Sequence, residues 1–424
     1  MAIKALRGFK DILPGESEKY RFMEDQARRV FRNFGFQEIR TPILEKTELF
    51  ARGIGDHTDI VEKEMYTFKD RRGESVTLRP EATAGVMRAI LEHKLYSQGR
   101  DLKLFTIGPM FRYERPQKGR LRQFNQINSE LIGSQSPLAD AEIIWMAWDI
   151  LTRCTSAELR VEINSLGCPD CRPLHREALD LFLENQAKEL CEDCMRRSKT
   201  NPLRIFDCKQ EKCRSILKFA PVIKHYWCPE CSKHLGEVLD LLEILEIPFV
   251  INSFLVRGLD YYVRTTFEII AKGLGAQNTV AAGGRYDGLS KVLGGPDLPG
   301  VGMAVGMERL LLLLDERDYG DRLQLFIAAL GREAREEAVE WLKGFRDNNI
   351  SVQMSYEDKS LKAQLKQADR LKSRYVLIIG EKELEEEVAI LKNMETSQQQ
   401  SIPLEEVTTS VTKVLCSANE ETQE

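Results

Sequence analysis

FRYERPQKGRLRQFNQINSELIG, at residues 111–133, consists of two strand-like runs joined by a short basic loop that turns at residues 116–119. Five basic residues between positions 112 and 122 oppose only Glu114: Arg112, Arg115, Lys118, Arg120 and Arg122. Guanidinium groups on such a hairpin can bind phosphate oxygens bidentately. Phe124, which alternates with polar residues, can stack on a base. A solvated basic hairpin explains the same pattern, so this segment alone leaves both explanations open.

Upstream, residues 77–83 (TLRPEAT) form a strand that ends at a proline and leads into a helix. Glu81 and Thr83 therefore fall at the helix N-terminus, where a carboxylate and free amides can meet a polar ligand. Plain helix capping accounts for the same residues.

Downstream, residues 257–268 (RGLDYYVRTTFE) place Arg257 near two adjacent tyrosines. Neighbouring residues on a strand point to opposite faces, so we expect Tyr261 or Tyr262 to line a pocket while the other packs. An edge-strand aromatic pair beside an exposed arginine is the competing explanation. Residues 300–314 (GVGMAVGMERLLLLL) predict a strand of small residues running into a leucine-rich helix, with Arg309 in its first turn.

The surrounding pattern predicts an α+β domain built on a mainly antiparallel sheet. Apolar residues recur at helical spacing over 16–34, and further helices are expected at 82–96 and 137–152. We expect strands at 36–41, 76–78, 103–107, 123–132, 159–164 and 249–254. This first domain spans residues 1–320 and is interrupted at 168–247 by a helical, cysteine-rich insertion.

After a polar linker at 314–321, residues 323–424 alternate strands and helices and predict a three-layer α/β domain. Strands are expected at 325–330, 350–354 and 375–380, and helices at 333–345, 360–372 and 403–415. The acidic stretch at 381–387 predicts a solvated loop. In the second helix, four basic residues recur at i, i+3, i+7 and i+11 and suit phosphate contacts, although a solvated face is the plainer explanation: Lys359, Lys362, Lys366 and Arg370.

Composition excludes several classes of protein. The chain has 424 residues, 42% hydrophobic and 30% charged, which is too apolar for a disordered chain. Its net charge of −5 excludes a wholly basic nucleic-acid-binding surface. No run approaches the roughly 20 apolar residues of a membrane span, and the N-terminus lacks the apolar core of a secretory signal. We therefore expect a cytoplasmic protein.

Familiar nucleotide-binding and hydrolytic motifs are missing from the sequence. No Gly-Lys pair exists to form a P-loop, and Gly300, Gly302 and Gly306 are spaced one residue too far for a dinucleotide fingerprint. HExxH and GxSxG are absent as well. Any nucleotide chemistry must therefore use another scaffold.

The insertion holds eight of the ten cysteines. Three CxxC pairs and one CxxxxC pair are present: Cys168/Cys171, Cys191/Cys194, Cys228/Cys231 and Cys208/Cys213. In a reducing compartment such pairs have the spacing of a structural zinc site, since two pairs supply a Cys₄ tetrahedron. Buried or free thiols are the alternative, and the sequence does not say which pairs combine.

Taken together, the segments resemble the class II aminoacyl-tRNA synthetases, and histidyl-tRNA synthetases in particular. The resemblance covers nearly the whole chain. It is carried by GFKDILP (8–14), LRPE (78–81), FRYERPQKGRLRQFNQ (111–126), RGLDYY (257–262), GGRYDGL (283–289) and GMERL (306–310). It implies ATP-dependent ligation of L-histidine to tRNA(His) through a histidyl-adenylate, with Mg²⁺, a homodimer formed through helix 16–34, and a C-terminal anticodon-binding domain. Neither DNA nor a membrane is an implied partner.

The resemblance also implies roles for individual residues. Arg112 and Arg257 hold the α-phosphate from opposite sides, with Gln126 near it. Glu114, Phe124 and Arg309 bind the adenine and γ-phosphate. Histidine is bound by Glu81 and Thr83 at its amino group and by Glu130 and Tyr262 at its imidazole, in a pocket shaped by Tyr261 and Tyr286.

Two other functions remain open from the sequence. One is a catalytically inactive paralogue serving as the regulatory subunit of ATP phosphoribosyltransferase. Its relatives usually lack the motif arginines and the C-terminal domain that are present here. The other is an RNA- or histidine-binding module without catalysis.

Overall fold

A computed structural model describes residues 3–56, 58–99, 101–186, 189–275, 278–320 and 322–420. The chain forms two compact units that meet between Tyr319 and Gly320, within the predicted linker. Asp321 of that linker, residues 187–188 of the insertion and the outermost ends of the two predicted domains (1–2 and 421–424) lie outside the described residues. Each unit is described by itself below.

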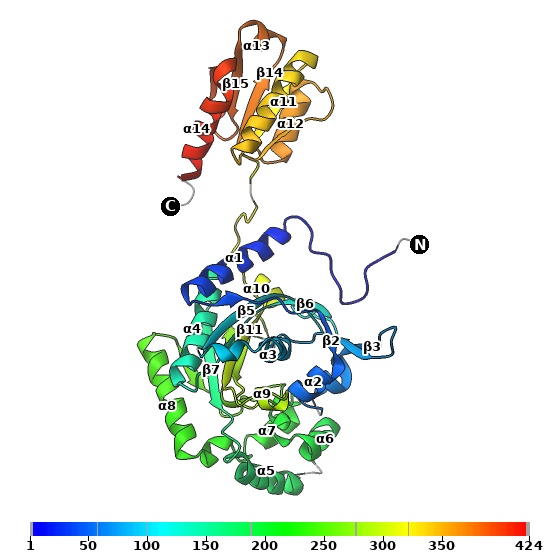
Figure 1. Ribbon diagram of the computed structural model, residues 1–424, viewed down its shortest axis with the longest axis vertical. Helices are drawn as coiled ribbons and strands as arrows, with labels where there is room; N and C mark the ends of the chain where they lie inside the picture. Colours follow the sequence, from blue (N-terminus) through cyan, green and yellow to red (C-terminus); the bar gives the residue numbers. More distant parts are fainter. Residues whose placement is uncertain are drawn as a thin grey trace. The chain divides into compact units, whose positions relative to one another are not determined.

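The first unit is built on an eight-stranded sheet in the order β1-β5-β6-β11-β10-β9-β7-β8 (Figure 1). Its strands are β1 (Gln37–Glu38), β5 (Leu102–Phe111), β6 (Gln123–Ile132), β7 (Leu159–Ser165), β8 (Phe249–Ile251), β9 (Val263–Ala271), β10 (Thr279–Arg285) and β11 (Gly300–Gly306). Only the edge pairs β1–β5 and β7–β8 are parallel. The prediction of a mainly antiparallel sheet is therefore confirmed. A second, three-stranded sheet consists of β2 (Leu44–Lys46), β4 (Ser75–Leu78) and β3 (Tyr66–Lys69).

Helices α1 (Ser17–Asn33), α4 (Pro137–Cys154) and α8 (Pro229–Ile244) cover one face of the large sheet (Figure 1). Their apolar sides meet strand residues such as Ile127 and Phe267 in a single buried core. The opposite face carries α3 (Thr83–Glu92) and the buried residues Tyr262 and Tyr286. Shorter helical segments are α2 (Thr47–Ile54), η1 (Ile60–Glu64), η2 (Leu95–Gln98), α9 (Leu289–Val292) and α10 (Met307–Leu311).

The insertion is helical, as predicted. Before α8 it consists of α5 (Arg172–Gln186), α6 (Glu192–Thr200), η4 (Pro202–Asp207), α7 (Glu211–Leu217) and η5 (Ile223–Tyr226). These segments share a small core of their own, which includes Leu179, Ile205 and Leu217. Helix α8 differs, because its residues Leu235 and Val238 belong to the core of the large sheet. The last helix of the insertion therefore ties it to the large sheet.

The second unit is a three-layer α/β domain, as predicted. Its sheet has the order β13-β12-β14-β15-β16. The strands are β12 (Leu325–Ala329), β13 (Val352–Met354), β14 (Tyr375–Ile379), β15 (Val388–Asn393) and β16 (Gln399–Pro403). Helices α11 (Arg332–Asp347) and α14 (Val407–Glu420) share a core with one face, and α12 (Leu361–Arg370) packs on the other.

Several predicted boundaries were wrong. The strand expected at 36–41 is only two residues long, because the chain leaves the sheet edge ahead of Pro42. The acidic stretch expected as a loop contains helix α13 (Glu381–Glu385), which rests on Leu384 packed against the domain core. The last helix begins at Val407 and not at Pro403, because Pro403 ends strand β16. Strands β15 and β16 were not predicted.

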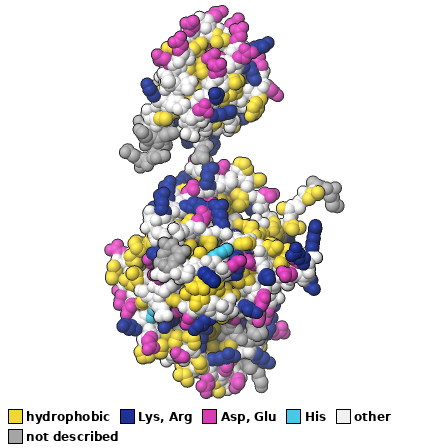
Figure 2. All heavy atoms as spheres, viewed as in Figure 1, with side chains coloured by type: hydrophobic (Ala, Val, Ile, Leu, Met, Phe, Trp, Pro, Cys, Tyr) yellow, Lys and Arg dark blue, Asp and Glu magenta, His cyan; other side chains and the backbone are white. Residues whose placement is uncertain are grey.

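Acidic and basic side chains are interspersed over the face of each unit seen in Figure 2, as the near-balanced composition predicts. Within the described part of the chain, no helix has the length and apolar character that crossing a membrane requires.

Candidate active site

A cavity of about 440 Å³ opens in the first unit, on the face of the large sheet that carries α3. Its walls come from strands β6, β9, β10 and β11, from the start of α3 and from the loop between β5 and β6. Ten of the twelve residues predicted to bind histidine or ATP line it: Glu81, Thr83, Arg112, Glu114, Phe124, Gln126, Arg257, Tyr261, Tyr262 and Arg309. The other two, Glu130 and Tyr286, lie behind Thr83 in the adjoining core.

Strand β6 supplies one wall by simple alternation. Ile127 and Leu131 point into the helix-covered core, so the even-numbered residues between 124 and 130 point the other way. Phe124, Gln126 and Asn128 consequently face the cavity. Asn128 had no predicted role, although the same alternation along β6 could have placed it on the cavity face. The buried Gln126 Oε1 atom has no hydrogen-bond partner among the described residues, so it is available to a ligand.

Glu81 holds the entrance to α3. Its two carboxylate oxygens accept hydrogen bonds from the backbone amides of Thr83 (2.6 Å) and Ala84 (2.9 Å). Burial raises the pKa of this carboxyl, while the two amides lower it. Glu81 therefore caps the N-terminus of α3, and the same hydrogen bonds fix its carboxylate on the cavity wall.

Glu130 is fully buried behind Thr83. One oxygen accepts from Thr83 Oγ1 at 2.7 Å, and the other accepts from the Tyr286 hydroxyl. Burial raises the pKa of Glu130 to about 8, against the lowering effect of these two hydrogen bonds. Below about pH 8 the side chain therefore mostly holds its proton in the folded protein.

As the pH rises from about 5 to 8, the free energy of unfolding of Glu130→Gln should increase relative to that of the wild type. In that window the folded wild type keeps a proton that the unfolded chain has already lost, so wild-type stability falls with increasing pH. The slope approaches about 1.4 kcal/mol per pH unit, and glutamine has no such proton to lose. Denaturant unfolding of both proteins at several pH values measures the difference. A difference that stays constant with pH would contradict the assignment.

Gly302 on β11 makes room for Glu130. A Cβ atom there would lie 1.9 Å from Glu130 Oε2 and 2.6 Å from the Ser129 carbonyl oxygen. The second contact is with backbone, so a side chain at position 302 cannot be relieved by a rotamer change alone. This explains the glycine at position 302, directly opposite Glu130 in the sheet.

Gly302→Ala should therefore lower the free energy of unfolding by about 1–3 kcal/mol, the usual cost of overpacking a buried site. The matched control is Gly306→Ala on the same strand, where the nearest atom to a new Cβ is 3.9 Å away. Denaturant unfolding compares the two variants. Equal stability would show that the sheet yields at Gly302 without cost.

Arg112 and Arg309 reach the cavity from two different elements. Arg112 follows β5, donates from Nε to the Pro80 carbonyl at 2.8 Å, and its guanidinium lies 5.5 Å from the centre of the Phe124 ring. Arg309 lies on α10 and donates to the Thr279 carbonyl at 2.5 Å. Backbone carbonyls thus hold both guanidinium groups at the cavity wall. Glu114, in the same loop as Arg112, pairs with Arg120 at 2.8 Å.

Arg257 lies on the cavity wall with its charge balanced by Glu268. The Nη1–Oε1 distance is 2.5 Å, and the second oxygen of Glu268 accepts from Thr279 Oγ1 at 2.7 Å. Nε of Arg257 is buried and has no hydrogen-bond partner among the described residues. Glu268, which also lines the cavity, ended the segment quoted above but had no predicted role.

The prediction that only one of the two tyrosines faces the pocket was wrong. Tyr261 and Tyr262 both line the cavity, with ring centres 4.7 Å apart. The alternation rule does not apply to them because both precede β9, which begins at Val263. Tyr286 packs edge-on against Tyr261 from behind, at 5.6 Å.

The insertion also contributes to the cavity, through Asp207 and Lys209. Burial raises the pKa of Asp207. Nearby, Arg197 and Arg204 of the insertion form ion pairs with Asp59, with N–O distances of 3.0 and 3.2 Å. Sequence spacing could not predict that Asp207 and Lys209 line the cavity, because they are about 50 residues or more from every segment that forms the rest of its wall.

The remaining predicted residues lie elsewhere. Lys362, Lys366 and Arg370 are exposed on α12, but Lys359 precedes the first helical residue, Leu361, and so does not share that helix face. Lys359 pairs instead with Glu357 at 3.1 Å. The eight cysteines of the insertion gather into two groups of four.

Comparison with known proteins identifies the family of the chain. The family model described as "Histidyl-tRNA synthetase" matches residues 8–310, which include every cavity residue described above. The chain belongs to the histidyl-tRNA synthetase family. A model described as "Anticodon binding domain" matches residues 324–414 of the second unit.

Members of this family resemble the chain over nearly their whole length. The histidine–tRNA ligase of Desulfatibacillum aliphaticivorans is 51% identical, covering 97% of this chain and 99% of that protein. The enzyme of Geobacter sulfurreducens is also 51% identical, with coverages of 97% and 100%. The crystal structure of apo histidyl-tRNA synthetase from S. aureus superposes with a TM-score of 0.83 at 38% identity, covering 97% of this chain and 100% of that one.

A more distant structure bears on the regulatory alternative. A protein from Bacillus halodurans, titled as an ATP phosphoribosyltransferase regulatory subunit/histidyl-tRNA synthetase, has a TM-score of 0.66 at 21% identity and covers 90% of this chain. Similarity at that level shows a shared fold alone. The full-length relatives at 51% identity are named as ligases, so the regulatory alternative is not favoured.

Proposed function

We propose that this chain ligates L-histidine to tRNA(His) in two steps, using ATP as its magnesium complex and releasing diphosphate and then AMP. The observation that carries the proposal is the pairing of Arg112 and Arg257 on the walls of one cavity, beside a carboxylate- and tyrosine-rich end. The two arginines can hold an activated phosphate, and the carboxylate- and tyrosine-rich end can hold a small polar amino acid.

In the first step the histidine carboxylate attacks the α-phosphorus of ATP, and negative charge builds on the phosphate oxygens and on the departing diphosphate. Arg112 and Arg257 stabilise that charge from two sides, because their guanidinium groups stay protonated and can bind oxygen pairs. The buried Nε–H of Arg257, which has no hydrogen-bond partner among the described residues, can donate to the same oxygens, and Gln126 can donate from its amide nitrogen beside it. Positioned cationic groups in a partly desolvated cavity stabilise the developing negative charge more than water would.

The adenosine end of ATP occupies the wall formed by β6 and α10. Phe124 stacks on the adenine, Arg309 covers its other face and reaches the γ-phosphate, and Glu114 accepts from the adenine amino group. Glu114 and Glu268, which line the cavity, would offer oxygen ligands to the magnesium ion that comes with ATP, and the ion would supply neutralisation of phosphate charge.

Histidine occupies the end of the cavity near α3. Glu81 and Thr83 bind its α-amino group, and Glu130 with Tyr262 reads the two ring nitrogens, in a pocket shaped by Tyr261 and by Tyr286 packed behind it. The protonated Glu130 has one O–H donor beside its remaining acceptor positions, so the hydrogen bonds from Thr83 and Tyr286 leave it able to pair with a ring nitrogen. An amino acid without a ring donor would leave these buried groups unpaired, which is a strong basis for rejection.

In the second step the 3′-terminal ribose of tRNA attacks the adenylate. None of the cavity residues described above is required as the base, and an oxygen of the adenylate phosphate can take the proton. The second unit binds the anticodon, and Lys362, Lys366 and Arg370 supply phosphate contacts from the exposed side of α12.

The proposal extends to assembly and surroundings. Helix α1 and the adjacent edge strand β1 form the dimer interface, the protein works in the cytoplasm, where its tRNA partner is used, and the insertion holds structural zinc. Sedimentation of the purified chain tests the first of these, since a monomer at working concentration would exclude it.

The deciding experiment measures histidine-dependent exchange of labelled diphosphate into ATP, followed by attachment of labelled histidine to tRNA(His). Exchange with histidine, and none with the other amino acids, supports the proposal. Binding of histidine or RNA without exchange would identify a binding module. Activation of an ATP phosphoribosyltransferase without exchange would identify a regulatory subunit.

A further inference from the structure

The eight cysteines of the insertion form two tetrads whose ligand atoms converge. The root tetrad is Cys168, Cys171, Cys228 and Cys231, and the tip tetrad is Cys191, Cys194, Cys208 and Cys213. Within each tetrad all four sulfur atoms lie within 4.8 Å of one another. We propose that each tetrad binds one zinc ion, so that the chain carries two separate structural zinc centres. This inference goes beyond the ligase reaction and does not depend on it.

The sulfur spacing has the size of a zinc tetrahedron. A Zn–S bond of about 2.3 Å places the corners of a regular tetrahedron about 3.8 Å apart. In the root tetrad the Sγ–Sγ distances are 3.6 Å from Cys168 to Cys171 and 3.9 Å from Cys168 to Cys228. In the tip tetrad Cys191 and Cys208 are 3.8 Å apart. A disulfide would need about 2.05 Å, and all eight cysteines are free.

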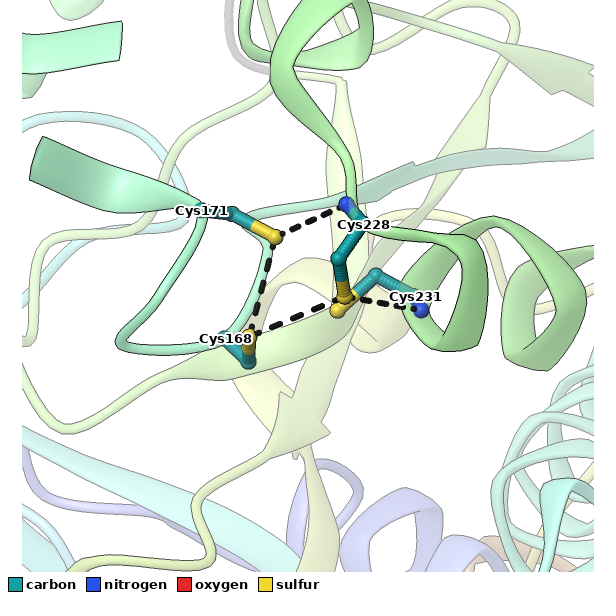
Figure 3. Close-up of side chains that lie close together, drawn as sticks. All are labelled: Cys168, Cys171, Cys228 and Cys231. Carbon is teal, nitrogen blue, oxygen red and sulfur yellow. Dashed lines mark hydrogen bonds between the residues drawn. The ribbon is translucent and has the colours of Figure 1, made fainter. Parts of the chain in front are cut away.

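The backbone around each tetrad is arranged for thiolate sulfur. In the root tetrad, Figure 3 shows the Cys228 amide pointing at Cys171 Sγ (3.2 Å) and the Cys231 amide pointing at Cys228 Sγ (3.4 Å). The tip tetrad repeats this, with amides of Cys191 and Cys194 donating to sulfur. Such second-layer bonds orient metal ligands and favour the charged sulfur that binds zinc.

Each tetrad joins segments that lie apart in the sequence. The root tetrad ties the chain leaving β7 to the start of α8, and so closes the insertion at its base. The tip tetrad joins α6, η4 and α7, whose shared core has few large apolar residues. A core that small gains most from a metal crosslink.

Both centres adjoin the cavity wall. Arg172, next to Cys171, donates to the backbone carbonyl of Tyr262. Cys208 stands between the cavity residues Asp207 and Lys209. Zinc at these two places would hold Tyr262 and the 207–209 segment in position, and its loss should raise the Michaelis constants more than it lowers the turnover number. This consequence alone depends on the proposed function.

The test is the metal content of the full chain, purified without added metal and measured by mass spectrometry. Wild-type protein should hold two zinc ions per chain. Cys168→Ser/Cys228→Ser and Cys191→Ser/Cys213→Ser should each hold one, because each removes half of one tetrad. Cys154→Ser and Cys416→Ser, which lie outside both tetrads, should keep two.

Cobalt substitution of wild-type protein supplies a second measurement if a double variant fails to fold. Two equivalents should bind with the visible absorption of tetrahedral thiolate-bound cobalt. One zinc ion per chain or fewer, iron in its place, or unchanged zinc in both double variants would overturn the proposal. None of these readings depends on aminoacylation, so a failed ligase assay with two zinc ions bound would count against the proposed function alone.

Discussion

Arg257→His is expected to slow histidine-dependent diphosphate exchange by about 10²–10³-fold, the usual effect of removing one fixed donor from a developing charge. The Michaelis constants for ATP and histidine should change much less, because the guanidinium is needed mainly as charge builds on the α-phosphate. Arg257→Lys should restore part of the rate, since it keeps the positive charge but loses the planar pair of donors. Single-turnover and steady-state exchange assays separate these effects.

The control must allow for the ion pair that Arg257 makes with Glu268. Breaking a buried pair can destabilise a protein by about 3–5 kcal/mol, so thermal unfolding has to be followed beside activity. Arg160→His, at an exposed position on β7, provides the matched substitution away from the cavity. Near-normal exchange by a folded Arg257→His protein would make Arg257 a structural residue, and the mechanism would need another cation.

A chain ending at Tyr319 should retain much of the exchange activity but charge tRNA at least about 10²-fold less efficiently. The physical reason is that the two units have separate cores, and the buried clusters of the second unit begin at Leu323. A loss of 10²-fold corresponds to about 3 kcal/mol of tRNA binding. Parallel measurement of exchange and of tRNA charging tests this expectation.

A second variant separates the basic side chains of α12 from the rest of the domain. Changing Lys362, Lys366 and Arg370 together to alanine should weaken charging and reduce its sensitivity to salt, while exchange stays unchanged. Full charging by the shortened chain would exclude the second unit from tRNA recognition.

The fold could be predicted wherever the sequence carried a local period. The run at 123–132 predicts strand β6 because a turn at residues 116–119 separates it from the preceding strand-like run. Strands β15 and β16 were missed because they are short, polar in part and paired mainly with each other and β14. These strands form because they pair with a neighbouring strand, and local sequence patterns do not predict that pairing.

The site divides in the same way. Residues such as Arg112 and Arg257 stand in motifs with a recognisable order, so the amino-acid sequence alone was enough to name them. Asp207 and Lys209 could not be named in this way, because they reach the cavity only through the packing of a distant insertion. The same packing decided which cysteine pairs combine, as Cys168/Cys171 faces Cys228/Cys231 across about 60 residues of chain.

The alternation along β6 has a practical meaning for protein engineering. Side chains on one face of this strand point toward the ligand cavity, and those on the other face pack against the helices behind the sheet. A combinatorial library that varies only positions 124, 126 and 128 can therefore explore new ligand preferences while Ile127 and Leu131 preserve the scaffold. Randomising the whole stretch would confound the two, because most inactive clones would be misfolded ones.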